Sequence, residues 1–479
     1  MRRSDSGLTM RKLLASTLAL LWLPSSLGAC GSASPNPGDS TGGGTPSGGT
    51  SALPAGGTAA GGVQTLGGQL SPGGQASTGG VTGDTGGGNA VVGGEAGSGG
   101  SSGTAGGAGG MISGGAGGTS AGGSGGGEPC VVDHGQAVPS LREYYADYFS
   151  LGVAIDTQYS RYNTLLTKHY NSVTAEDQMK FDALQPSEGN FSYGTADQMV
   201  TFATSNGIDV RGHALVWHRQ TPSWVFSGSA AQVLSRMKNH ISNVMQHFHG
   251  KVKIWDVVNE AIMDDGTYRT NNEESGQESG WYGALGESYI AEAFKAARAA
   301  DPDAKLYYND YYNYHPVRRQ AIYEMLQGLL AAGVPVDGVG LQAHLNLAPG
   351  TDPDEQSYHQ TVENLEEAIE MYSLLGLDVQ VTELDISLYL RGVTYTPDTF
   401  YTPAKVTPEV LEKQADRYRE FFEMFRRHGD VISSVTTWGI SDDNTWLSEF
   451  DSGRQDFPLL FDKDLQPKPA FWAVVDFCK

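Results

Sequence analysis

The chain has 479 residues, 65 of them glycine, and its formal net charge at pH 7 is −23. Because like charges repel, this balance argues against a nucleic acid or another polyanion as partner and suits a neutral substrate.

The first 29 residues have the composition of an export signal. Two basic residues precede the apolar run Leu13–Leu23, which is too short to span a membrane as a helix. The segment Leu27–Cys30 resembles a bacterial lipobox, which implies cleavage before Cys30 and acylation of its thiol. We expect an exported lipoprotein of the outer membrane or cell surface, in contact with the membrane only through this lipid. An ordinary secretory signal and a secreted product are the alternative, and either Met1 or Met10 is the start.

Residues 30–128 form a glycine-rich segment with many serines and threonines, and residues 31–128 contain no lysine, arginine or aromatic residue. Such a segment buries too little apolar surface to offset the entropy cost of ordering it, so we expect a disordered tether. The composition then changes, and residues 129–479 are numerous enough for one large catalytic domain with its own core.

Eight apolar or alternating segments in this domain predict buried strands, and helical segments with one apolar face lie between them. Alternating strands and helices of this number and length predict an α/β fold, specifically a (β/α)8 TIM barrel. A doubly wound open sheet is the alternative, although no glycine-rich phosphate loop follows any strand. The expected strands lie near Leu151–Ile155, Asn171–Thr174, Asp209–Leu215, Val252–Val258, Lys305–Tyr308, Gly338–Leu341, Asp378–Thr382 and Ser434–Thr437.

Two of these strands end in a glutamate, Glu260 after the fourth and Glu383 after the seventh. The carboxyl ends of barrel strands meet at one mouth, so the two carboxyl groups should lie close together. One such group can protonate a leaving oxygen while the other attacks the sugar carbon or activates water. The pair therefore predicts glycoside hydrolysis.

The other strand ends carry side chains that suit a sugar site, because amides and imidazoles orient hydroxyl groups and indoles stack on pyranose faces. The candidates are Glu176, Asp177, Lys180, His213, Trp217, Gln220, Asn259, Asn309, Gln342, His344, Trp438 and Trp446. Three histidines on one helical stretch, His240, His247 and His249, have no carboxylate partners at a barrel mouth. We interpret them as solvated helix residues and expect neither a metal nor a cofactor.

Four segments, on separate predicted strands, resemble the signatures of family 10 glycoside hydrolases, the (β/α)8 endo-β-1,4-xylanases. They are Arg211–His218, Trp255–Ala261, Gly340–His344 and Thr382–Asp385. The resemblance extends over about residues 135–478. It implies an enzyme that acts on xylan and xylo-oligosaccharides with retention, for which the two carboxyl groups should be about 5–5.5 Å apart. We expect a monomer.

The resemblance also implies roles for individual residues. Glu260 would be the acid/base and Glu383 the nucleophile, while Asn259 would bond the sugar 2-hydroxyl in the −1 subsite. Gln342 and His344 would hold the nucleophile and the glycone. The remaining glycone contacts would come from Glu176, Lys180, His213 and Gln220, with Trp217, Trp438 and Trp446 as sugar platforms. A cis peptide bond between His213 and Ala214 is implied as well.

Asp177 departs from the family pattern, which usually has asparagine there. Ionised aspartate only accepts hydrogen bonds, whereas asparagine also donates, so recognition in the −2 subsite should be altered. The alternative is that Asp177 pairs with Lys180 and leaves sugar binding unchanged. Three further departures are Phe181 for tryptophan, Ala214 for threonine and Leu447 for arginine.

With Cys30 acylated, Cys130 and Cys478 remain, one at each end of the expected domain. In an exported protein such a pair suggests a disulfide that joins the two ends. Two unrelated thiols are the alternative.

Two rival functions stay open at this point. Another barrel β-glycanase, such as a cellulase or mannanase, shares the Asn-Glu and Glu strand ends. A non-catalytic carbohydrate-binding surface lipoprotein is the rival from another class, and the presence of both Glu260 and Glu383 argues against it.

Overall fold

The computed structural model describes residues 137–270, 278–353, 356–391, 393–450 and 454–476. The chain divides into two units between Gly123 and Ser124, and every described residue belongs to the second unit. The expected signal, the lipid-bearing Cys30, the tether, and both Cys130 and Cys478 lie outside the described residues.

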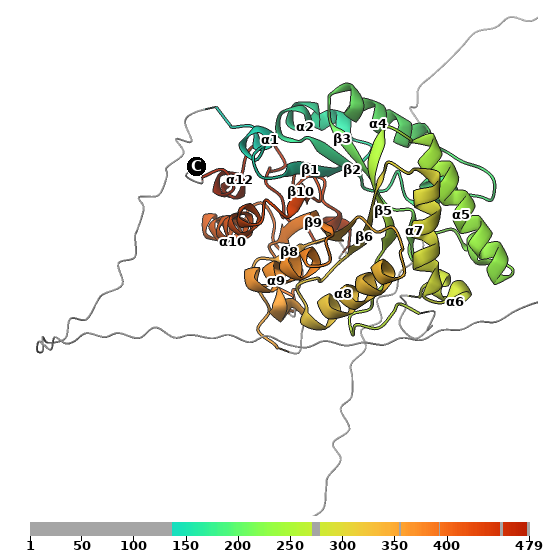
Figure 1. Cartoon of the computed structure of the whole chain (residues 1–479). Coiled ribbons are helices and arrows are strands. Elements are labelled where there is room, and N and C mark those ends of the chain that lie inside the picture. The colour runs from blue at the N-terminus through green and yellow to red at the C-terminus, as the bar shows by residue number, and fades with distance from the viewer. Residues whose placement is uncertain (1–136, 271–277, 354–355, 392, 451–453, 477–479) are drawn as a thin grey trace, which may run out of the picture. The chain divides into compact units, whose positions relative to one another are not determined.

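Eight parallel strands form a closed barrel, which confirms the predicted (β/α)8 architecture (Figure 1). Consecutive strands of the ring pair with one another, and the last strand pairs with both the first and the one before it. This closure leaves no free sheet edge in the ring and excludes the open-sheet alternative. The strands are β1 (Ser150–Ile155), β2 (Ser172–Ala175), β3 (Asp209–Gly212), β5 (Val252–Asn259), β6 (Lys305–Asp310), β7 (Gly338–Leu341), β9 (Asp378–Ser387) and β10 (Ile432–Thr437).

Helices surround the strands, as Figure 1 shows. The longer ones are α4 (Gly194–Ser205), α5 (Ala230–His247), α7 (Ser288–Ala300), α8 (Pro316–Ala331), α9 (Val362–Ser373) and α10 (Pro408–Arg427). The shorter ones are α1 (Leu141–Tyr144), α2 (Asn163–His169), α3 (Phe181–Leu184), α6 (Gly280–Leu285), α11 (Trp446–Phe450) and α12 (Pro469–Ala473). Three 3-10 helices are η1 (Tyr159–Tyr162), η2 (Ser223–Phe226) and η3 (Gln356–His359). Two short strands, β4 (Val216–Trp217) and β8 (His344–Asn346), pair with β5 and β9.

The α5 helix illustrates why the helices form where the periodicity predicts them. It begins with a capping box in which Ser229 and Gln232 satisfy each other's backbone amides. Its predicted apolar face is fully buried, and Met237, Ile241 and Val244 are each 0% exposed. The burial of this face against the barrel, more than helix propensity, stabilises the helix.

The third strand ends earlier than the predicted Leu215, at Gly212. The bond from His213 to Ala214 is cis, as expected, and the chain pairs again at β4. Glycine is required at position 212 because a Cβ atom there would lie 2.2 Å from the ring of Trp255. The seventh strand of the ring, β9, is longer than predicted and runs to Ser387.

The barrel interior contains a buried ion pair. Arg211 and Asp256 form two hydrogen bonds, and Gln380 accepts another from Arg211 at 2.6 Å. Because a buried charge is costly without a partner, this pairing is needed for both residues to stay inside the barrel.

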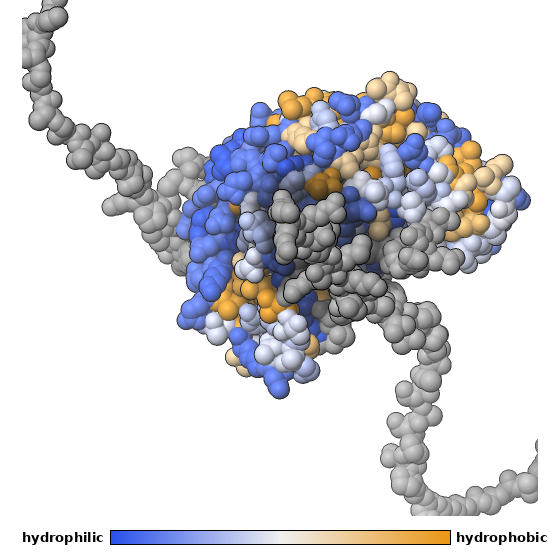
Figure 2. Space-filling model, turned by 90° about the horizontal axis from the view of Figure 1, so that it is seen from below, coloured by the Kyte–Doolittle hydropathy of each residue, from blue (hydrophilic) through white to orange (hydrophobic). Residues whose placement is uncertain are grey.

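Hydrophobic residues on the face shown in Figure 2 occur in separate patches on a mostly hydrophilic surface. Within the described ranges, none of the helices combines the length and hydrophobicity needed to cross a membrane.

Candidate active site

Glu260 lies at the carboxyl end of its barrel strand, as predicted, and Glu383 lies next to Leu384, the last residue of β9 that pairs with β10. Glu260 directly follows β5 with a positive φ of 58°, and Glu383 lies inside β9. Asn309 connects their surroundings, because its Nδ2 donates to Glu383 Oε1 at 2.8 Å and to Asn259 Oδ1 at 3.0 Å. The hydroxyl of Thr382 donates to Asn309 Oδ1 at 2.6 Å and thereby fixes the orientation of that amide.

The carboxyl group of Glu260 is surrounded by hydrogen-bond donors. Trp217 Nε1 donates to Oε2 at 2.9 Å, and Gln342 Nε2 donates to Oε1 at 3.0 Å. Burial by itself raises the pKa of this carboxyl. Four groups oppose this effect of burial on the pKa. In decreasing order they are the charge of His218, the Gln342 amide, the charge of Arg269 and the Trp217 indole, and together they lower the pKa to about 2.

The charge on His218 is present only in acid. Burial, followed by the nearby Arg269 cation, lowers the pKa of the His218 ring to about 3, and its side chain is only 4% exposed. Its Nδ1 lies 3.9 Å from Glu260 Oε2. The ring is therefore neutral near pH 7, and in that range the donors Gln342 and Trp217 and the Arg269 charge are what lower the pKa of Glu260.

Glu383 is held by a histidine that carries a positive charge. His344 Nε2 lies 3.2 Å from Glu383 Oε2, and His344 Nδ1 lies 3.0 Å from Asp385 Oδ2. Burial lowers the pKa of His344, but the two carboxylates outweigh burial and raise it to about 10. Trp446 Nε1 also donates to Asp385 Oδ2, at 2.8 Å. The His344 ring between these two carboxyl groups fixes the position of the Glu383 side chain.

The polar residues after β2 and β3 meet at a second part of the site. Asp177 Oδ1 accepts from Lys180 Nζ at 2.8 Å and from Gln220 Nε2 at 3.1 Å. The Lys180 ammonium also lies over the Trp217 ring, 5.0 Å from its centroid. Glu176, half-buried, directly follows β2 beside them. These contacts agree with the alternative in which Asp177 pairs with Lys180.

His213 and Trp438 lie between these two parts. His213 Nδ1 lies 3.0 Å from Asp256 Oδ2, and its ring meets the Trp438 ring edge-on at 5.5 Å. The Trp438 ring also meets His344 edge-on at 6.4 Å, and Trp438 is only 6% exposed. Trp438 therefore contacts both His213 and His344, and His344 is the ring that holds Glu383.

The sequence model of glycosyl hydrolase family 10 matches residues 140–477, which cover the barrel with its two glutamates. The chain belongs to glycosyl hydrolase family 10.

Similar proteins of this family have xylanase names. The chain is 44% identical over 346 residues to a beta-1,4-xylanase of Dictyoglomus thermophilum, covering 72% of this chain and 92% of that protein. It is 42% identical over 348 residues to an endo-1,4-beta-xylanase of Geobacillus stearothermophilus, covering 71% of this chain and 99% of that protein. A similar solved structure is the crystal structure of xylanase XynB from Paenibacillus barcinonensis complexed with a conduramine derivative. The TM-score is 0.64 and the sequence identity is 40%, and the match covers 71% of this chain and 98% of that chain.

Several residues of this family 10 site were not among the predicted ones. Asp385 was identified at the end of the segment Thr382–Asp385 but was given no role, although alternation places it on the same face of β9 as Glu383. Asp256 also has a signal, since it interrupts an apolar strand. Arg269 has none, because it reaches Glu260 from nine residues along the chain, where its Nε donates to the Glu260 carbonyl at 2.9 Å.

The prediction that all three helix histidines are solvated is wrong for His240. That ring is 0% exposed, stacks on Phe181 at 3.5 Å and bonds Gln185 through Nδ1 at 3.0 Å. Phe181, which replaces the usual family tryptophan, is thus part of the packing that buries it. His247 Nε2 and His249 Nδ1 lie at the surface, 2.8 and 3.0 Å from carboxyl oxygens of Asp197 and Asp301.

One group of possible metal ligands lies elsewhere in the described part of the chain. The ligand atoms of Glu366, Glu370 and His428 are all within 4.8 Å of one another. Glu366 already pairs with Arg427 at 2.9 Å and with His428 at 2.8 Å. Its negative charge is therefore already balanced by protein groups.

Proposed function

We propose that this family 10 glycosyl hydrolase cleaves internal β-1,4 bonds of xylan with retention of configuration, as an endo-1,4-β-xylanase. The observation that carries the proposal is the different surroundings of the two carboxyl groups. Glu383 faces an imidazolium and an amide donor, whereas Glu260 faces neutral donors that a sugar can displace. The xylanase names of the relatives, and a solved mutant structure in complex with xylotriose that is 39% identical with a TM-score of 0.64, support xylan as substrate.

In the first step Glu383 attacks the anomeric carbon, and the bond from that carbon to the leaving oxygen breaks. Glu260 donates its proton to the leaving oxygen, and a covalent glycosyl ester forms on Glu383. In the second step Glu260 accepts a proton from water, whose oxygen attacks the same carbon and releases Glu383. His344 holds the Glu383 carboxyl group in place through its contact with Oε2 at 3.2 Å.

Glu260 must carry a proton in the first step, although its pKa without sugar is about 2. Sugar hydroxyls that accept hydrogen bonds from Gln342 remove one of the donors that lower this pKa. Exclusion of water by the sugar acts in the same direction, because burial raises the pKa of this carboxyl. Substrate binding therefore shifts Glu260 toward the protonated form that the step needs.

The other side chains bind the sugar in this proposal. Asn259 bonds the 2-hydroxyl in the −1 subsite, and Gln342 and His344 hold the glycone beside Glu383. Glycone hydroxyls are bound by Glu176, Lys180, His213 and Gln220, with Asp177 and Asn309 orienting these groups and Trp217, Trp438 and Trp446 as hydrophobic platforms.

We also propose that the enzyme works as a monomer at the outside of the cell, attached through a lipid on Cys30 and a tether over residues 30–128. The lipobox-like segment Leu27–Cys30 and the composition of the tether support this location. Metabolic labelling with a radioactive fatty acid tests it, because Cys30→Ser should abolish incorporation.

The substrate is tested by measuring reducing sugar released from xylan, carboxymethyl-cellulose and mannan by the same preparation. We expect release mainly from xylan; preferential release from one of the others would assign the enzyme to a different β-glycanase. The anomer formed first is observed by proton NMR, and an initial α product would exclude the retaining mechanism. Lack of hydrolysis with retained binding would favour the non-catalytic alternative.

A further inference from the structure

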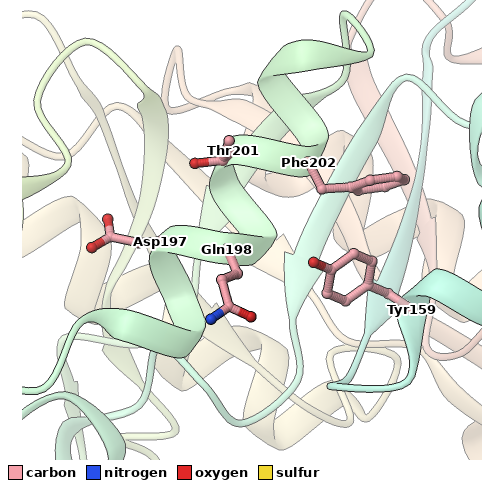
Figure 3. Close-up of a pocket in the computed structure, with 5 residues that line it drawn as sticks. All are labelled: Tyr159, Asp197, Gln198, Thr201 and Phe202. Atoms are coloured by element: carbon pink, nitrogen blue, oxygen red, sulfur yellow. The ribbon is translucent and has the colours of Figure 1, made fainter.

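A pocket lies on the outer wall of the barrel, between η1 and α4, apart from the residues of the active site. It has a volume of about 420 Å³ and is lined by Tyr159, Asp197, Gln198, Thr201 and Phe202. In Figure 3 the Phe202 ring of α4 lies beside the Tyr159 ring, whereas Asp197 and Thr201 project from the other side of α4. The depression is wide open to solvent, so a ligand would lie along the surface and contact it with one face.

The helix presents these four side chains on one face because of its 3.6-residue period. Positions 197, 198, 201 and 202 point to the pocket, whereas Ala196, Met199, Val200 and Ala203 are at most 2% exposed and face the core. The pocket therefore does not result from missing core packing. It is a surface feature of a fully packed helix.

The lining combines aromatic and hydrogen-bonding groups. Tyr159 and Phe202 are half-buried, with ring centroids 4.9 Å apart at an angle of 45°. Among the described residues, no side chain or backbone group hydrogen-bonds the Tyr159 hydroxyl, the Gln198 amide or the Thr201 hydroxyl. Asp197 accepts from His247 Nε2 at 2.8 Å, which leaves its second oxygen for another donor. A sugar ring has this same combination of an apolar face and equatorial hydroxyls.

The charge of the protein further restricts the class of ligand that this pocket can bind. With a net charge of −23 and a carboxylate in the lining, the pocket is unsuited to an anion. Two half-buried rings offer too little apolar area for a stable protein partner. A neutral, hydroxyl-rich chain fits the lining.

The two elements that line the pocket, η1 and α4, each follow a barrel strand in the chain. The η1 helix follows β1, and Tyr162 and Arg161 of η1 bond Asp443 in the loop after β10, at 3.2 and 2.9 Å. The α4 helix follows the segment that begins at the carboxyl end of β2 with Glu176 and Asp177.

We propose that this pocket is a second binding site for β-1,4-xylan, remote from the cleavage point, and the proposal rests on the proposed function. It raises the effective concentration of polymeric substrate at the enzyme, because a chain held at one site is presented to the other. Substrates too short to reach both sites gain nothing from it.

The test uses the double variant Gln198→Ala/Thr201→Ala, because both side chains are exposed and the fold does not depend on them. We expect its rate on limiting insoluble xylan to fall about fivefold, the effect of one lost hydrogen bond, with kcat/KM on xylotriose unchanged. Gln327→Ala, an exposed glutamine on α8, is the matched control and should leave both rates unchanged. Equal losses on xylan and xylotriose, or no loss on either, overturn the proposal.

A binding measurement separates this inference from the proposed function. With Glu260→Gln and Glu383→Gln added to prevent hydrolysis, the pocket double variant should bind insoluble xylan about fivefold more weakly than its parent. Tyr159→Ala should weaken binding as well, provided its melting temperature shows a folded protein. Unchanged binding in the folded variants refutes the second site, whereas failure of the wild-type chain to hydrolyse xylan refutes the proposed function instead.

Discussion

Asp177→Asn changes one atom in the glycone part of the site and distinguishes two accounts of this departure from the family pattern. Asp177 Oδ1 accepts from both Lys180 and Gln220. Burial raises the pKa of the Asp177 carboxyl, but the Lys180 charge and the hydrogen bonds from Lys180 and Gln220 outweigh burial and lower it. The carboxyl group is therefore ionised throughout pH 5–8.

The amide keeps an oxygen for these donors and replaces the second oxygen with an N–H donor. If this donor reaches a sugar hydroxyl, one added hydrogen bond worth about 1 kcal/mol raises kcat/KM on xylo-oligosaccharides about fivefold, and at most about tenfold. The loss of the ion pair is a small effect, because the Asp177 side chain is 54% exposed and solvent screens its charge. An exposed pair contributes about 0.2–1 kcal/mol, which corresponds to a fall in melting temperature of about 1–2 °C or less for a domain of this size.

The assay is kcat/KM on xylotriose to xylohexaose at pH 5–8, together with thermal unfolding. Asp209→Asn is the matched control, because Asp209 forms an exposed ion pair with Lys253 at 2.7 Å on β3 and β5, at the opposite ends of the strands from the site. An unchanged or lower kcat/KM for Asp177→Asn would refute the added hydrogen bond. It would leave the ion pair with Lys180 as the account of this residue.

The pKa of His344, about 10, lies above its value of about 6.5 in the unfolded chain, so this group stabilises the fold fully below pH 6.5 and loses its effect as the pH rises through 10. The free energy of unfolding should therefore fall over pH 6.5–10 and depend less on pH in His344→Gln, and equal slopes would contradict the charged ring. Glu260→Ala should lower kcat about 10²–10⁴-fold, and added azide should restore activity with a β-glycosyl azide as product; an α-azide would contradict the assignment of the acid/base. Deletion of residues 31–128 should leave the melting temperature and the rate on soluble xylan nearly unchanged, and a large drop in melting temperature would show that the segment packs on the barrel. Cys130 and Cys478 should resist a thiol reagent in the denatured, unreduced protein, whereas labelling at both positions would exclude the disulfide.

Local sequence patterns were enough to predict the barrel and the two glutamates. The eight strands were identified because alternating apolar residues, or short continuous apolar runs, are typical of buried strands. This signal lies within each strand and does not depend on which strands pair with it. Glu260 and Glu383 were identified because a polar residue at the end of such a strand faces the one mouth of the barrel where strand ends meet. Both inferences need only the residues within about ten positions.

The protonation states and the partners of the site residues depended on tertiary structure. His344 is charged because Glu383 and Asp385 flank it, whereas His218 is neutral because burial and the Arg269 cation oppose its charge. Both histidines lie next to one of the two proposed catalytic carboxyl groups, and no local pattern distinguishes them. The difference arises from charges brought together from separate strands and loops, and electrostatic energies depend on distance in space and on burial, not on separation along the chain.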